Sequence, residues 1–404
     1  MANLRMAARR LLNKYELEAP DDFVREMLEL AINALMDAEV TAQIGAGRYE
    51  RSEDRTTWRN GNRSRRWDTR VGTVDLEIPK LRDGSYYPSF LESRRRSERA
   101  LLAVIQEAYV DGVSTRKVDR LAKALGIEGI SKSQVSRICA ELDELVEAWR
   151  NRRLEEPIVY MWLDATFPKV RENGRVSSMG AVLAVGVTAE GQRRILGLDI
   201  GATESVEFWL SFLRSLVARG LNGVQLVTSD AHEGLKQAIS AVLTGSTWQR
   251  CRVHFMRNVL SQVAKRDGPE VLERIRSIFA QTTAEEARQH LHAAAATLER
   301  KHPKVAGMLE EAEADMLAYT AFPQPHWRKI WSTNPLERLN REVKRRTRVV
   351  GIFPNRKSVI RLVGASLMEQ DDEWLSGRRY ISEESMAPLL TAPMLMPAPA
   401  PMMS

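Results

Sequence analysis

The chain has 404 residues, of which 44% are hydrophobic and 28% charged, an ordinary composition for a soluble globular protein of two or three domains. Its formal net charge of +7 favours an anionic partner, and nucleic acid is the commonest one. The sequence contains no apolar run long enough for a membrane span, no secretory signal and no disulfide framework, so we expect a cytoplasmic, nucleoid-associated protein.

Residues 1–96 combine a predicted helix with a basic arm. An apolar stripe at helical spacing runs through residues 21–44, which predicts one long amphipathic helix. Residues 45–70 mix arginines with Tyr49, Trp58 and Trp67 and have little apolar periodicity. Two interpretations stay open for this segment: a loop-rich surface that contacts phosphates and stacks on bases, or a solvated arm. On the first interpretation the DNA-binding residues are Arg59, Arg63, Arg65 and Arg66.

A short strand follows the arm. Val74, Leu76 and Ile78 alternate with polar residues, and we expect Pro79 to end the strand because proline has no N–H group to donate to a sheet. With this strand, residues 1–96 form a predicted unit for DNA binding or dimerisation.

Residues 97–154 predict a helical domain with a helix-turn-helix pattern. Helices over residues 97–110 and 114–125 lead through a turn with two glycines, Gly126 and Gly129, to a third helix. Ser131 has the spacing from Gln134 that forms a capping box, which marks where the third helix begins. Polar and basic residues near that beginning are the candidates for contact with DNA, namely Lys132, Ser133, Gln134 and Arg137.

From residue 155 the pattern changes to strands and helices in succession. Apolar runs over residues 158–163, 181–187 and 194–200 predict an antiparallel meander. The elements that follow predict a mixed α/β layer over residues 155–267. They are a helix over 204–218, a strand over 224–227, a helix over 233–243 and a strand over 248–251.

The last third of the chain returns to this layer after an interruption. Residues 268–326 carry apolar residues at helical spacing throughout, which predicts an all-α insertion before the α/β fold resumes over residues 327–380. Residues 381–404 are rich in Pro, Ala and Met, and we expect a disordered tail. The predicted fold class is therefore α/β with an all-α insertion, preceded by mainly helical N-terminal DNA-binding domains.

Three acidic residues are the candidates for chemistry. Asp164 and Asp230 each end an apolar strand, and Glu337 lies in a basic segment, at intervals of 66 and 107 residues. Carboxylates at strand ends are held rigidly, and three of them suit two Mg²⁺ ions, which prefer oxygen ligands. Asp199 also lies near a strand end, but Gly201 after it indicates a turn, so we set Asp199 aside.

The segment around Glu337 predicts a strongly basic helix. Asn334 is the predicted N-cap and Pro335 the first helical residue. Residues 334–361 contain nine Lys or Arg and two Glu. The alternative interpretation is a solvated basic helix with an incidental glutamate. If the helix binds phosphates, its DNA-binding residues are Arg338, Arg341, Lys344, Arg345 and Arg348, four of which share one helical face.

The chain resembles the Mutator-type transposases of insertion sequences in six segments spread over most of its length. These are WDTRVGTVDLEIPKLR (67–82), SERALLAVIQEAYVDGVSTRKVDRL (97–121), WLDA (162–165), SDAHEGLK (229–236), CRVHFMRN (251–258) and NPLERLNREVKRR (334–346).

The resemblance implies an RNase H-like catalytic domain, interrupted before its last acid, with Asp164, Asp230 and Glu337 as the catalytic and metal-binding triad. It implies cleavage of the element's terminal inverted repeats with Mg²⁺ or Mn²⁺, and transfer of the 3′ hydroxyl into target DNA. Because two DNA ends must be held at once, we expect a homodimer or larger assembly and no membrane partner.

Other residues in the matching segments are expected near this site. Cys251 and His254 have the spacing of half a zinc site, but because the other ligands are missing we favour a structural or DNA-proximal role. We expect His232 to orient Asp230 by a hydrogen bond, and we expect Asn340 either to support the acids or to lie near the DNA. Arg252 and Arg257 are further candidates for phosphate contacts.

Two rival functions stay open at this point. A non-catalytic helix-turn-helix regulator would explain the basic charge but would leave the strand-end acids without a role. A metal-dependent nuclease of the same fold would use the acids without strand transfer. An ATP-driven machine is disfavoured because the sequence contains no Gly-rich phosphate loop.

Overall fold

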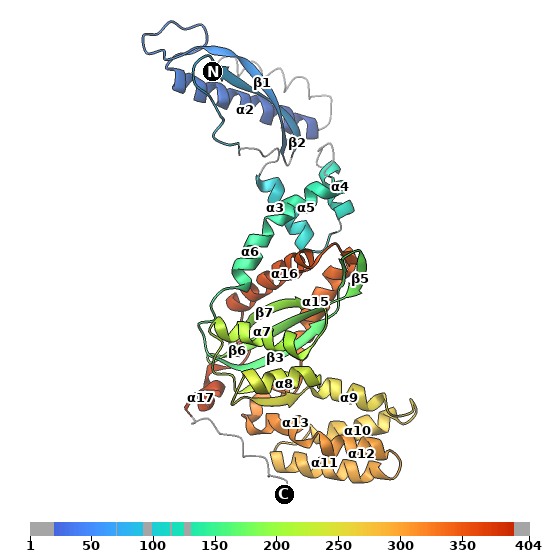
Figure 1. Cartoon of the computed structure of the whole chain (residues 1–404). Coiled ribbons are helices and arrows are strands. Elements are labelled where there is room, and N and C mark those ends of the chain that lie inside the picture. Colours follow the sequence, from blue (N-terminus) through green and yellow to red (C-terminus); the bar gives the residue numbers. More distant parts are fainter. Residues whose placement is uncertain (1–19, 70, 92–98, 114, 125–130, 392–404) are drawn as a thin grey trace. The chain divides into compact units, whose positions relative to one another are not determined.

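The computed structural model describes residues 20–69, 71–91, 99–113, 115–124 and 131–391 (Figure 1). The chain divides into two compact units, Met1–Glu141 and Leu142–Ser404, which are described separately.

In the first unit a long helix packs on a β-hairpin. Helix α2 (Pro20–Ile44) covers the antiparallel strands β1 (Arg59–Thr69) and β2 (Gly72–Leu81). Met36, Val40 and Ile44 from the helix and Leu76 and Ile78 from β2 are completely buried and form the core. The apolar face of the hairpin therefore turns toward the helix, while most of the β1 side chains stay exposed.

Two predictions for this region are wrong. Residues 59–69 are a strand and not a loop, because the polar side chains of β1 lie on the exposed face of a hairpin whose core comes from β2 and α2. Pro79 does not end β2, since it lies opposite Asn62, where β1 has a register shift that removes the need for an N–H donor. Trp67 packs on Phe90, with ring centroids 5.7 Å apart, and is partly buried in this core.

Three short helices follow. The helices α3 (Arg99–Val110), α4 (Thr115–Ala124) and α5 (Lys132–Ala140) pack around Ile105, Val118, Val135 and Cys139. The predicted capping box is confirmed, because the Ser131 hydroxyl accepts from the Gln134 N–H and the Gln134 side chain accepts from the Ser131 N–H. The predicted turn with Gly126 and Gly129 lies outside the described residues.

The second unit is built on a five-stranded mixed sheet with the order β7-β6-β3-β8-β9. Neighbouring strands among β7, β6 and β3 are antiparallel, which confirms the predicted meander, whereas β8 is parallel to both β3 and β9. The strands are β3 (Ile158–Thr166), β6 (Gly180–Thr188), β7 (Arg193–Gly201), β8 (Leu226–Ser229) and β9 (Thr247–Arg250).

A second small sheet was not predicted. The hairpin of β4 (Lys169–Glu172) and β5 (Arg175–Ser178) is joined by β10 (Ile352–Phe353), which runs parallel to β4. Most side chains of β4 and β5 are exposed, so they lack the apolar pattern that predicts a strand.

Helices cover both faces of the large sheet. On one face, α7 (Val206–Ala218) and α8 (Glu233–Val242) bury Trp209, Phe212 and Leu213 against Met161 and Leu163 of β3. The other face meets α15 (Asn334–Val350) and α16 (Arg356–Ser376).

The predicted domain boundary at residue 154 is too late in the chain. Helix α6 (Leu142–Arg150) packs on α16, and the Arg361 guanidinium donates to both carboxylate oxygens of Asp143 at 2.7 and 2.8 Å. Val146 approaches so closely that a Cβ at Gly364 would lie 2.4 Å from it. These contacts hold α6 in the second unit.

Residues 268–326 contain helices and no strand, as predicted. After α9 (Arg252–Leu260) come α10 (Gly268–Ile278), α11 (Ala284–Glu299), α12 (Pro303–Glu311) and α13 (Glu313–Leu317). Two 3₁₀ turns, η1 (Ala318–Ala321) and η2 (Gln324–His326), and the short α14 (Trp327–Ile330) then lead back toward the sheet.

The predicted disordered tail contains a helix, α17 (Glu383–Thr391). Met386 is completely buried, and the Gln225 side-chain amide donates to the Leu389 carbonyl at 3.1 Å. Composition suggested a low-complexity tail, but Met386 supplies apolar surface that the second unit buries. Residues 392–404 lie outside the described residues. None of the described helices is both long enough and apolar enough to cross a membrane.

His326 connects this tail to the sheet. It is completely buried, its Nδ1 lies 2.7 Å from the Tyr160 hydroxyl, and its Nε2 lies 2.9 Å from the Ser385 hydroxyl. Burial, and to a smaller extent the Lys329 charge, lowers the pKa of His326 to about 4.

We predict that stability falls as the pH drops from 6.5 toward 4, because the unfolded chain protonates His326 in this range and the native protein does not. The contribution of this residue is about 3 kcal/mol and is fully lost below pH 4. Urea unfolding of the full chain at several pH values measures it, with His326→Gln, which cannot ionise there, as the comparison. Equal slopes against pH in both proteins would contradict the prediction.

Candidate active site

Asp164 lies near the end of β3, on the face that meets α15. Tyr160, Trp162 and Asp164 are alternate residues of that strand and therefore share one face of the sheet. On this face Tyr160 contacts His326, and Trp162 lies edge-on to Tyr380 at a centroid distance of 6.1 Å. Asp164 Oδ1 accepts from the Ala165 N–H at 2.9 Å. Burial raises the pKa of Asp164, and the nearby Asp230 charge adds to the rise, whereas Ala165, His254 and Lys344 oppose it.

Asn340 joins helix α15 to this carboxylate. Its Nδ2 donates to Asp164 Oδ2 at 2.6 Å, and the asparagine is buried. Leu336, Leu339 and Val343 are buried on the same helix, so its apolar side packs inward while its basic side stays accessible. This bond places the Asn340 side chain against one of the three acids.

The helix begins one residue earlier than predicted. Asn334 is its first residue, and Thr333, not Asn334, is the N-cap. The Thr333 side chain makes no capping bond, and its hydroxyl lies 3.4 Å from Cys251 Sγ, which also accepts from the Thr333 N–H. Pro335 is therefore the second helical residue.

Asp230 directly follows β8. The Ser229 carbonyl accepts from the Cys251 N–H at 2.7 Å, and the Thr228 hydroxyl donates to the Ile330 carbonyl at 2.7 Å. These bonds attach the end of β8 to the residue that follows β9 and to helix α14. The strand end thereby brings Asp230 close enough for its charge to raise the pKa of Asp164.

Glu337 and Asp164 line the same open hollow of about 970 Å³. Glu337 is exposed, one helical turn before Asn340. The hollow is otherwise strongly basic. Its lining includes Arg257 and all five residues of the helix that were predicted to bind DNA, which are Arg338, Arg341, Lys344, Arg345 and Arg348. Arg345 differs from the others because it pairs with Glu342 at 2.6 Å.

The carboxylates suit a hard divalent cation in their chemistry, since each offers only oxygen ligands. Within the described part of the chain, however, no three His, Cys, Asp or Glu side chains are grouped closely enough to hold a metal ion. Binding a metal would therefore require Asp164, Asp230 and Glu337 to move closer together.

Cys251 and His254 lie beside the acids without forming a group of metal ligands. Cys251 is completely buried and precedes α9, and His254, in the first turn of that helix, lines the hollow. Burial alone would raise the pKa of the Cys251 thiol, but bonds with His254 and Thr333 lower it below its ordinary value. Interaction with Cys251 raises the pKa of His254 despite its burial, and the two aspartates raise it further.

Two residues near the acids differ from the predictions. Arg252 does not line the hollow, because its guanidinium lies over the rings of Trp331 at 4.2 Å and Phe279 at 5.0 Å, where it stabilises an aromatic cluster. His232 precedes α8, and the described residues provide no hydrogen bond between it and Asp230. Its charge acts on Glu204 instead.

Glu204 is a fourth acid that the sequence analysis missed. It is half-buried just before α7, and burial raises its pKa, as do the charges of Asp230 and Asp164. Its position after a strand was the available signal, but we placed it inside a helix. The carboxylate of Asp199, which was set aside, accepts from the Arg150 guanidinium at 3.2 Å and from the Ile200 N–H at 2.8 Å.

The predicted DNA-binding residues of the first unit fall into two groups. Arg59 is a structural residue, because it donates to Asp37 at 3.3 Å and to the Thr41 hydroxyl at 2.7 Å and so joins β1 to α2. Gln134 is engaged in the capping box. The residues with side chains at the surface are Arg63, Ser133 and Arg137, together with Arg65, which donates to the Tyr87 hydroxyl, and Arg66, 3.9 Å from Asp75. The side chain of Lys132 lies outside the described part.

Comparisons with known proteins agree with the resemblance in the sequence. The family described as "Transposase, Mutator family" matches residues 2–377. The transposase for insertion sequence element IS1081 of Mycobacterium tuberculosis is 51% identical over 369 residues, which cover 91% of this chain and 89% of that protein. The transposase for IS256 in transposon Tn4001 of Staphylococcus aureus is 40% identical over 371 residues, 91% of this chain and 95% of the relative.

One of the solved structures that align with this chain has only a low similarity to it. It is the Drosophila P element transposase strand transfer complex, 13% identical, covering 76% of this chain and 85% of that one. The TM-score of 0.29 is too low to indicate a shared fold.

We predict that Asn340→Ala lowers the free energy of unfolding by about 1.5–3 kcal/mol, because it leaves the partly buried Asp164 carboxylate without this hydrogen bond. Urea unfolding of the full chain measures the loss. Asn258→Ala, at an exposed asparagine of α9, is the matched control and should change stability by less than about 0.5 kcal/mol. Equal effects of the two substitutions would show that the bond contributes nothing.

Proposed function

The chain belongs to the Mutator family of transposases, and from this premise we propose that its second unit cleaves the ends of an insertion sequence and joins them to target DNA at Asp164, Asp230 and Glu337. The observation that carries the proposal is the Asn340–Asp164 bond, because it holds a strand-end acid and the basic helix in one hollow. The rival function of a non-catalytic DNA-binding regulator gives these acids no role.

The proposal includes an RNase H-like fold for the catalytic domain. The support is the strand order β7-β6-β3-β8-β9, with an antiparallel meander followed by two parallel strands. In this arrangement Asp164 and Asp230 lie at the ends of adjacent parallel strands, where ligands of α/β sheets bind. Residues 268–326 separate them from the third acid.

The three acids would hold Mg²⁺ or Mn²⁺, two ions for each site, once they approach each other more closely. Bound ions would activate the attacking oxygen and stabilise the leaving oxygen. Asp164 is desolvated and near a second negative charge, so its carboxylate has the most to gain from a cation.

The residues of the chain itself would position the DNA. Phosphoryl transfer needs mainly orientation and charge neutralisation from a protein. Arg257, Arg338, Arg341 and Lys344 line the hollow and would bind the phosphates on either side of the reacting one. His254, whose pKa is raised, would hold a proton beside Asp164 and so favour its ionised form.

The first unit would bind the terminal inverted repeats. Its exposed residues Arg63, Ser133 and Arg137 would contact DNA, and the exposed rings of Tyr49 and Trp58 could stack on bases. Two ends must be held together during strand transfer, so we propose that the transposase acts as a homodimer or a larger assembly in the nucleoid.

We expect Asp164→Asn, Asp230→Asn and Glu337→Gln each to reduce cleavage and strand transfer by at least about a hundredfold, because a neutral amide cannot neutralise a cation. Gel assays with labelled end DNA and a target plasmid measure both reactions, and binding of the ends should persist. Asp199→Asn, at an acid that is structural, is the control and should keep activity. Full activity in any triad variant would remove that residue from the site.

Removal of divalent metal separates the rival functions. With EDTA we expect end binding without nicking, and added Mg²⁺ or Mn²⁺ should restore both nicking and joined products, because the acids alone cannot activate the attacking oxygen. Failure to nick with either metal would favour the regulator. Nicking without joined products on a target plasmid would favour the nuclease.

A further inference from the structure

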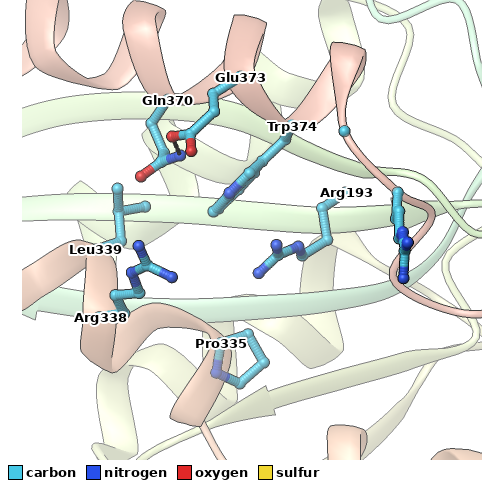
Figure 2. Close-up of a pocket in the computed structure, with 9 residues that line it drawn as sticks. Arg193, Pro335, Arg338, Leu339, Gln370, Glu373 and Trp374 are labelled. Atoms are coloured by element: carbon cyan, nitrogen blue, oxygen red, sulfur yellow. Dashed lines mark hydrogen bonds between the residues drawn. The ribbon is translucent and has the colours of Figure 1, made fainter.

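A second, smaller cavity of about 170 Å³ lies where α15, α16 and β7 meet (Figure 2). Arg338 comes from α15, Trp374 from α16 and Arg193 from β7, and Arg378 follows the end of α16. The Arg193 and Arg338 side chains extend from opposite sides into the same space in Figure 2. Nothing in the proposed chemistry uses Arg193 or Arg378.

Arg193 is held in place by aromatic rings. Its guanidinium lies 4.3 Å over the ring of Trp374 and 4.6 Å over the ring of Tyr380. Such stacking fixes the plane of the guanidinium and leaves its N–H groups at the edge available to a ligand. Burial lowers the pKa of Arg193, and the Arg338 charge lowers it as well, so the native structure brings together cations that repel each other.

The cavity has more positive charge than its own acids can balance. The side chains of Arg193, Arg338 and Arg378 make no hydrogen bond or ion pair with the described residues. The one carboxylate in the lining, Glu373, is hydrogen-bonded to the Gln370 amide. Three guanidinium groups with one carboxylate are typical of a site that accepts an anion with several oxygens.

The position of the cavity points to the origin of that anion. Arg338 directly follows Glu337, and Arg338, Gln370 and Glu373 line both this cavity and the hollow that contains the acids. A DNA strand that passes Asp164 and Glu337 would therefore also pass this cavity. Because Arg193 covers one face of Trp374, the ring supports the guanidinium and does not offer that face to a base.

We propose that Arg193, Arg338 and Arg378 form a phosphate clamp that binds one backbone phosphate of the DNA strand cut at the hollow that contains Asp164 and Glu337. The inference rests on the proposed function and adds a positioning site to it. By fixing a neighbouring phosphate, the clamp sets the register of the strand, so that the correct phosphodiester bond reaches the acids.

Arg378→Gln in the full chain is the principal test, because this exposed side chain has no contact whose loss would disturb folding. We expect the slope of log K against log salt, for a duplex that carries an element end, to become less steep by about 0.9, the value for one lost phosphate contact. Arg193→Gln should do the same. Arg214→Gln, on α7 against the opposite face of the sheet, is the matched control and should keep the wild-type slope.

Duplexes with one neutral methylphosphonate at each position near the cut identify the phosphate. In the wild-type protein one position should reduce cleavage by about ten- to a hundredfold, the loss of one charge-assisted bond. At that position the methylphosphonate should not further reduce cleavage by the Arg378→Gln variant.

Unchanged slopes in both clamp variants, or equal methylphosphonate effects in the wild type and Arg378→Gln, would overturn the clamp. Binding of inorganic phosphate to these arginines without any methylphosphonate effect would overturn its assignment to the DNA backbone. Either result leaves the proposed function standing, because that depends on the acid variants. If those variants cleave normally, the function fails, whereas the salt slopes still report on the clamp.

Discussion

The hydrogen bond between Asn340 and Asp164 is the contact on which the rest of the site depends. It joins side chains 176 residues apart, across an all-helical insertion, and at 2.6 Å it is a short bond to a carboxylate acceptor. With Leu336, Leu339 and Val343 buried on the same helix, one face of α15 must turn toward the sheet. The basic face of the helix therefore lies along the hollow that contains Asp164 and Glu337.

This arrangement balances opposing electrostatic effects. Burial and the neighbouring Asp230 disfavour the charged form of Asp164, while Lys344 and His254 favour it. The same basic residues repel each other, and few acids are present to balance them. A bound polyanion would reduce the repulsion among the basic residues, and a divalent cation would offset the negative charges of Asp164 and Asp230.

The start of α15 has a second support in Cys251. Its sulfur contacts both the hydroxyl and the N–H of Thr333, and its thiol is coupled to His254 at the edge of the hollow. The Cys-x-x-His element therefore works as a structural connection between the end of β9 and the helix that carries Glu337. Such a role needs a buried thiol, and Cys251 is completely buried.

Local patterns in the sequence were enough to predict the meander of β3, β6 and β7, the helices of residues 268–326, the capping box at Ser131 and the acids at strand ends, because each depends on residues close together in the chain. Only the tertiary structure decided which arginine side chains make contacts inside the protein and which stay accessible. Arg59 and Arg252 resemble the arginines of the hollow in sequence, yet an aspartate and an aromatic cluster hold them. The tertiary structure also ordered α17 around Met386 and brought Arg193 to Arg338. The partners in these contacts are distant in the chain, and no periodicity of neighbouring residues encodes such a choice.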